Sequence, residues 1–162
     1  MQLSLKRKGD YAVRAMISVG RHYGSGLRQA RQISTEMHIP YKTLTLILAG
    51  LVAEGLLEAN HGPKGGYRLA RPPGDISVLD IVEAAEGPAK FDHCVLRDGP
   101  CDWEETCPVH DIWARTQDAL IRELASTSLA EMAAIDADIE AGSYKPKAPP
   151  HAVSTDRHGT RN

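Results

Sequence analysis

The sequence predicts a mainly α-helical chain with one small β-hairpin, followed by a cysteine-bearing loop and a long helix. Three observations predict this fold class. Apolar residues recur at helical spacing in three segments before residue 55, and two short strand-like runs then flank a turn rich in Gly and Pro. Cys94, Cys101 and Cys107 cluster in a later stretch rich in helix breakers. At 162 residues the chain fits one globular domain with an extension, which excludes large multidomain enzymes.

Three helices are predicted before the hairpin. The first spans residues 8–23, and a short second helix lies within residues 29–40 and ends at Pro40, which breaks helices. The third spans residues 41–54, and its predicted buried face consists of Leu44, Ile47, Leu48, Leu51 and Val52. Gly50 lies inside this third helix and predicts a close packing contact, since Gly there costs about 1 kcal/mol relative to Ala.

Residues 56–60 and 67–70 are predicted strands, joined by a tip of Gly- and Pro-containing sequence at residues 61–66. Three helices followed directly by a hairpin are typical of a winged helix-turn-helix, a DNA-binding module that we expect over residues 1–73.

The rest of the chain divides into three predicted parts. Residues 74–108 hold a short helix at about 79–84 and the cysteine loop. Residues 109–140 form an amphipathic helix whose apolar stripe suits dimerisation, and residues 141–162 are polar and predicted to be disordered.

The net charge of −2 conceals a strong asymmetry. Residues 1–72 hold 11 Lys and Arg against 4 Asp and Glu, whereas residues 73–140 hold 4 against 16. The first module can therefore approach a polyanion that the second would repel. The chain shows no signal peptide and no membrane-spanning apolar run, so we expect a cytoplasmic protein with no membrane partner.

Cys94, Cys101, Cys107 and His110 form the chemical centre of the sequence, because three thiolates and an imidazole can complete a tetrahedral metal site. Zinc accepts this donor set, and iron–sulfur clusters are held mainly by Cys, with His as a known substitute. The spacing alone does not choose between the two. An odd number of cysteines favours metal binding in a reducing compartment over a disulfide framework.

The segments LSLKRKGDYAVRAM, STEMHIPYKTL, GPKGGYRLARP and DISVLDIVEAAEG, followed by the three-cysteine loop, resemble the IscR/NsrR group of bacterial regulators in the Rrf2 superfamily over residues 1–137. The resemblance implies a homodimeric winged-helix repressor of transcription. It also implies an iron–sulfur cluster in the loop, whose state controls affinity for an operator in double-stranded DNA, and association with the nucleoid when bound.

The same resemblance implies cluster ligands at Cys94, Cys101 and Cys107, while the fourth ligand differs among relatives. His110 matches the IscR-like pattern, which holds a 2Fe–2S cluster and is the favoured alternative. Asp10 matches an NsrR-like pattern, in which an aspartate of the other subunit completes a 4Fe–4S site. His93 is a third, weaker candidate.

The candidate DNA contacts lie on the third helix, near the second helix and on the hairpin tip. They are Arg28, Arg31, Tyr41, Lys42, Thr43, Thr45, His61 and Lys64. Lys42 suits guanine or phosphate, and the glycines after Lys64 allow a close approach of the hairpin to DNA. His61 stands where the family usually has Arg, which replaces a permanent charge by one that titrates.

The sequence is compatible with three functions. The leading one is an iron–sulfur sensor of transcription, the second a constitutive DNA-binding protein with a structural Cys3His zinc site, and the third a small electron carrier. A helix-turn-helix argues against the carrier, because electron transfer has no need of one. The sequence contains no nucleophile triad, phosphate-binding Gly loop or H-E-x-x-H helix, so no enzyme is predicted.

Overall fold

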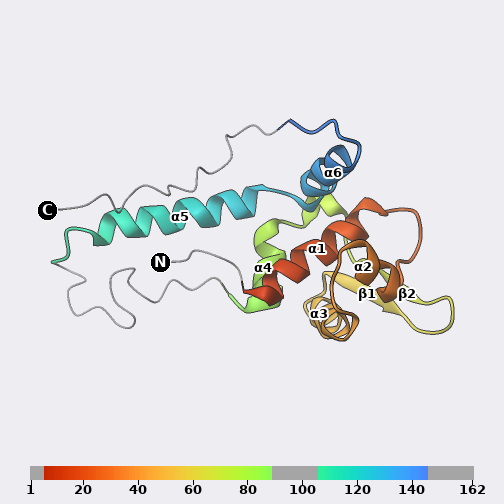
Figure 1. Cartoon of the computed structure of the whole chain (residues 1–162). Helices are drawn as coiled ribbons and strands as arrows, with labels where there is room; N and C mark the ends of the chain where they lie inside the picture. Colours follow the sequence, from red (N-terminus) through yellow and green to blue (C-terminus); the bar gives the residue numbers. More distant parts are fainter. Residues whose placement is uncertain (1–5, 89–105, 146–162) are drawn as a thin grey trace, which may run out of the picture.

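The computed structural model describes residues 6–88 and 106–145. Its first three helices are α1 (Arg7–Arg21), α2 (Ala30–Glu36) and α3 (Tyr41–Ala53), within about two residues of the predicted ends for α1 and α3. Figure 1 shows α1 at the centre of the body, with α2 and α3 on one side. A tight turn links α2 to α3, and His38 adopts a left-handed conformation in it with φ of 51°.

The hairpin follows α3 as predicted, with β1 (Leu57–Asn60) antiparallel to β2 (Gly66–Leu69). Leu57 pairs with Leu69, and Asn60 with Gly66. The backbone of Arg28 extends this small sheet, because Arg28 and Tyr67 exchange two hydrogen bonds of 2.9 and 2.8 Å. Three helices and this wing make up the predicted winged helix-turn-helix.

The packed body extends past residue 73. The short 3-10 helix η1 (Pro73–Asp75) leads into α4 (Val78–Glu86), and α6 (Leu129–Glu140) returns to cover α1. Ser77 caps α4 by accepting a hydrogen bond of 3.0 Å from the Asp80 backbone. One core contains residues of both the winged helix and the later segments, among them Met16, Ile33, Leu44, Leu48, Leu57, Ile76, Ile81 and Leu129.

The predicted helix over residues 109–140 is two helices. The first, α5 (His110–Ser126), ends at Thr127, whose backbone is extended, and Ser128 caps α6 by accepting from the Glu131 backbone at 3.2 Å. The break is anchored from outside, because Thr127 accepts a hydrogen bond of 2.9 Å from Val78 and Leu129 donates one of 2.7 Å to Ile76. The S-x-x-E sequence at 128–131 therefore starts a new helix where we expected a continuation.

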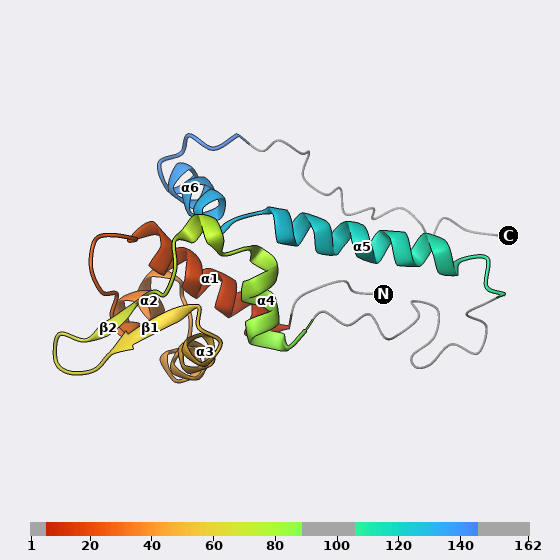
Figure 2. The same ribbon diagram turned by 180° about the vertical axis from the view of Figure 1, so that it is seen from behind.

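The helix α5 projects from the body, as Figures 1 and 2 show from opposite sides. None of its residues is buried, and α4 is the element it mainly contacts in the described part of the chain. Among residues 6–88 and 106–145, no helix has the length and apolar character needed to cross a membrane.

One of two further predictions has a clear outcome. Gly50 makes no close packing contact: an added Cβ would have nothing within 4 Å, so that prediction is wrong. Of residues 141–162, predicted to be disordered, residues 146–162 lie outside the described residues, so that expectation stays a prediction.

Candidate DNA-binding surface and cysteine motif

The first turn of α3 presents its polar residues to solvent. Tyr41, Lys42 and Thr43 are exposed, while Leu44 behind them is completely buried and fixes the rotation of the helix. The hydroxyl of Thr45 donates to the Lys42 carbonyl at 2.9 Å, so it already has a partner. A helix N-terminus with exposed polar side chains can approach the major groove.

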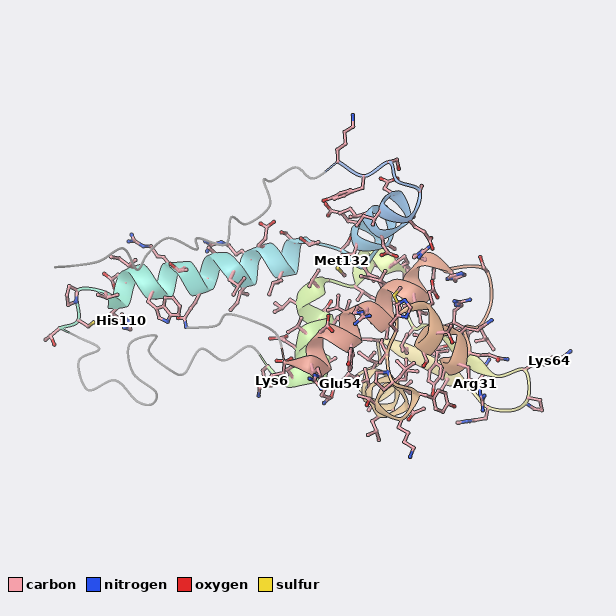
Figure 3. The ribbon with its side chains drawn as sticks, viewed as in Figure 1. Lys6, Arg31, Glu54, Lys64, His110 and Met132 are labelled. Carbon is pink, nitrogen blue, oxygen red and sulfur yellow. The ribbon has the colours of Figure 1, made fainter. Side chains whose placement is uncertain are left out.

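Positive charge gathers on the wing side of α3. The Arg31 guanidinium lies 5.7 Å from the centre of the Tyr41 ring, which holds it beside the start of α3. Figure 3 shows Arg31 and Lys64 on the same side of the body, with Glu54 on the side of α4 and Lys6. No residue of α3 is acidic, and Glu54 first appears at its C-cap. This surface is therefore suited to a polyanion.

Arg28 differs from its neighbours. Its side chain is only 17% exposed and pairs with Glu36. The carboxylate of Glu36 also accepts a hydrogen bond of 2.6 Å from Ser18 and lies 3.5 Å from Arg21. Burial alone would raise the pKa of Glu36, but the hydrogen bonds from Ser18 and Arg28 and the charges of Arg28 and His22 lower it. Arg28 therefore has an anionic partner within the fold, and the phosphate contact expected from the sequence stays a prediction.

The wing glycines have a structural reason to be glycine. A Cβ at Gly65 would collide with the Asn60 carbonyl, and one at Gly66 would lie 2.6 Å from the Arg28 carbonyl. His61 and Lys64 are exposed on the turn between the strands. The turn thus presents these two side chains whether or not its glycines approach DNA.

Of the predicted metal ligands, Cys107 and His110 lie in the described part of the chain. Both are half-buried, and they stand one turn apart where α5 begins, with the His110 backbone donating to the Cys107 carbonyl at 3.2 Å. Cys94, Cys101 and His93 lie outside the described residues. Residues 6–88 and 106–145 bring no three His, Cys, Asp or Glu side chains together as a metal site.

Asp10 lies in the first turn of α1, where it is exposed and pairs with Arg14 at 3.4 Å. Figure 3 shows His110 far from Lys6, which immediately precedes α1. The role of Asp10 as an alternative fourth ligand stays a prediction, because Cys94 and Cys101 lie outside the described residues.

Sequence reasoning missed two features of this region. Leu46 is 75% exposed on α3, although leucine usually joins the core. Its position off the stripe of Leu44, Ile47, Leu48 and Leu51 was a usable signal. The Arg28–Glu36 pair gave no such signal, because only the folded backbone brings the two side chains together.

Comparison with known proteins assigns the family. The family model described as Rrf2, iron-dependent transcriptional regulator, matches residues 5–135. The chain belongs to the Rrf2 family.

Relatives and solved structures agree with this assignment. The HTH-type transcriptional regulator IscR of Xenorhabdus nematophila is 31% identical over 130 residues, covering 80% of this chain and 79% of the relative. The structure of T. potens IscR matches with a TM-score of 0.67 and 30% identity, covering 90% and 95% of the two chains. CymR, the global cysteine regulator of B. subtilis, matches with a TM-score of 0.69 and 27% identity, covering 82% and 98%.

These similarities confirm the winged-helix fold and the resemblance stated from sequence. The chain is a DNA-binding transcription regulator of the Rrf2 family and not an enzyme, since its relatives are transcription regulators.

Proposed function

We propose that this Rrf2-family regulator is a cytoplasmic repressor that senses the state of an iron–sulfur cluster and changes its operator affinity accordingly. The supporting observation is that a Cys3His motif joins two helices of the regulator. Cys107 and His110 lie one turn apart at the start of α5, and Cys94 and Cys101 precede them in sequence. The family description, iron-dependent, favours this chemistry.

The residues present fit such a group. The donor set is three thiols and one imidazole, which suits an iron–sulfur cluster. Among the described residues, no hydrogen bond or ion pair engages the His110 ring, so the imidazole is available as a ligand. We assign Cys94, Cys101, Cys107 and His110 as ligands of a 2Fe–2S cluster, which would supply a redox- and ligand-sensitive centre. Asp10 of a partner subunit is the alternative fourth ligand, for a 4Fe–4S cluster.

DNA binding is assigned to the start of α3 and to the wing. Tyr41, Lys42, Thr43 and Thr45 would face the major groove, and Lys42 would bind phosphate or guanine. Arg31, His61 and Lys64 would bind the flanking backbone.

The projecting helix α5 is assigned to a homodimer. Ile112 and Leu120 are exposed along α5. Within the described residues α5 mainly contacts α4, and this contact leaves the apolar side of α5 uncovered. A second copy of α5 would bury this side and set the distance between two α3 helices. Cluster state and DNA affinity would then be coupled, and a coupling free energy of about 1–3 kcal/mol gives a 5- to 150-fold change in affinity.

The test begins with anaerobic purification of the full chain, an absorption spectrum, and iron, sulfide and zinc analysis of the same sample. We expect a coloured protein with equal iron and sulfide. Two irons per subunit support His110, and four support Asp10. One zinc in a colourless protein that cannot be reconstituted with iron and sulfide would establish the alternative, a structural Cys3His zinc site without sensing.

Two variants complete the test. Cys101→Ala should lose the visible absorbance and keep its helical content, whereas Lys42→Ala should keep the absorbance and weaken operator binding. Retained colour in Cys101→Ala would refute the ligand assignment, and unchanged affinity and salt dependence in Lys42→Ala would refute the role of α3.

A further inference from the structure

Leu46 is an unusual residue for its place in α3. Its side chain is 75% exposed, whereas Leu44, Leu48 and Leu51 of the same helix are buried. No packing contact within the described chain therefore explains a large apolar side chain at this position, and leaving it in water gains nothing for folding.

The residues that lie one turn from Leu46 along α3 include no acid. Lys42 lies one turn before it, and Ala49 and Gly50 lie one turn after it. Ala49 is exposed, and the position where Gly50 would carry a Cβ has nothing within 4 Å. No acidic side chain of α3 would therefore repel a DNA duplex from Leu46.

We propose that Leu46 determines sequence specificity by contacting the C5-methyl group of a thymine in the operator. The major-groove edges of the four base pairs carry hydrogen-bonding groups and one apolar group, the thymine methyl. A leucine has no hydrogen-bonding group, so this methyl is the complementary feature. The basic residues Lys42 and Arg31 beside the same helix favour DNA over an apolar protein partner. The inference rests on the proposed role of α3 in the major groove.

The experiment separates the methyl group from the rest of the base. Binding sites are first selected from randomised duplexes with the full-length protein, in its cluster-loaded and apo forms. Each thymine of the selected site is then replaced singly by deoxyuridine, which removes only the methyl group, and affinity is measured at fixed salt.

We expect one thymine per half-site at which deoxyuridine lowers the affinity of the parent protein about fourfold, the effect of one buried methyl group. Leu46→Ala should bind the thymine site about three- to tenfold more weakly and should no longer distinguish thymine from deoxyuridine there. Ile139→Ala, which truncates a side chain 56% exposed on α6, is the matched control and should behave like the parent.

Two results would overturn the inference. If the parent binds a selected site but no deoxyuridine substitution changes its affinity, or if Leu46→Ala retains the parent's discrimination, Leu46 does not contact a thymine methyl although α3 can still bind DNA. If Lys42→Ala and Leu46→Ala both bind like the parent, the proposed role of α3 fails as well. Far-UV circular dichroism and melting temperature should match the parent, since an exposed Leu→Ala change keeps a strong helix former.

Discussion

Arg28 and Arg31 are both candidate DNA contacts in the sequence. The structure predicts that replacing each with alanine affects a different property of the protein. Arg28 is 17% exposed and paired with Glu36, while Arg31 is exposed beside Tyr41. Arg28→Ala should therefore reduce folding stability, and Arg31→Ala should reduce DNA affinity without reducing stability.

The magnitude for Arg28 follows from what its loss leaves behind. Breaking a fully buried ion pair costs about 3–5 kcal/mol, because one charge stays without compensation. Here Glu36 is 21% exposed and keeps Ser18 and Arg21 as partners, so the cost should be smaller, about 1–2 kcal/mol. For a domain of this size that corresponds to a fall in melting temperature of roughly 2–8 °C.

The magnitude for Arg31 follows from counterion release. Removing one phosphate contact should lower the slope of log affinity against log salt by about 0.9. Thermal melting and operator titration between 50 and 200 mM salt measure both quantities on the same two variants. An Arg28→Ala protein as stable as the parent but with a reduced salt slope would show that Arg28 binds phosphate after all, and would refute the separation.

Three further predictions follow from the described contacts. Glu36→Gln should lower the folding stability at neutral pH. The difference in stability from the parent should vanish as pH falls through the lowered pKa of Glu36, because a carboxyl group with a depressed pKa stabilises the fold only while it is ionised. A difference that persists in acid would contradict this. Leu129→Ala should cost about 2–5 kcal/mol in chemical denaturation, because Leu129 is completely buried against α1, whereas Ile139→Ala on the same helix should cost little. Gly65→Ala should destabilise the wing by about 1–3 kcal/mol and speed its proteolysis, whereas Gly74→Ala, with open space around it, should not; equal behaviour of the two would refute the clash with Asn60.

The sequence was informative about the winged helix because its signals are local. The stripes that predict α1 and α3 arise from helical periodicity, and the hairpin tip arises from Gly and Pro content, so ends were predicted to within about two residues. The third helix also shows the limit of such signals. Gly50 suggested a close contact, yet its surroundings are open, since periodicity alone does not say what faces a position at the edge of the stripe.

The return of α6 could not be predicted in the same way. Its start depends on Val78 and Ile76 bonding to Thr127 and Leu129, groups about 50 residues apart in sequence. The pairing of Arg28 with Glu36 is likewise a product of the folded backbone. The proposed metal site is the opposite case. Its ligands Cys94 and Cys101 are assigned from the sequence alone, because both lie outside the described residues.

The arrangement of α4, α5 and α6 suggests how the cysteine motif can act on the DNA-binding surface under the proposed function. The beginning of α4 and the end of α5 are held together by the hydrogen bond between Val78 and Thr127, and the other ends of these helices are joined in sequence by the residues that include all three cysteines. Cluster ligation that fixed the distance between those ends would also fix the angle between α4 and α5.

That angle has consequences for the body because α6 begins directly after this joint and is tied to the winged helix. Arg21 of α1 binds Asp136 at 3.0 Å and pairs with Glu140, and it lies 3.5 Å from Glu36 of α2. Burial opposes the charge of Arg21, but these carboxylates raise its pKa. A rotation of α5 must therefore bend at Thr127 or move α6 together with α1 and α2. In the proposed dimer joined through α5, either response would change the relative orientation of the two α3 helices, on which the spacing of operator half-sites depends.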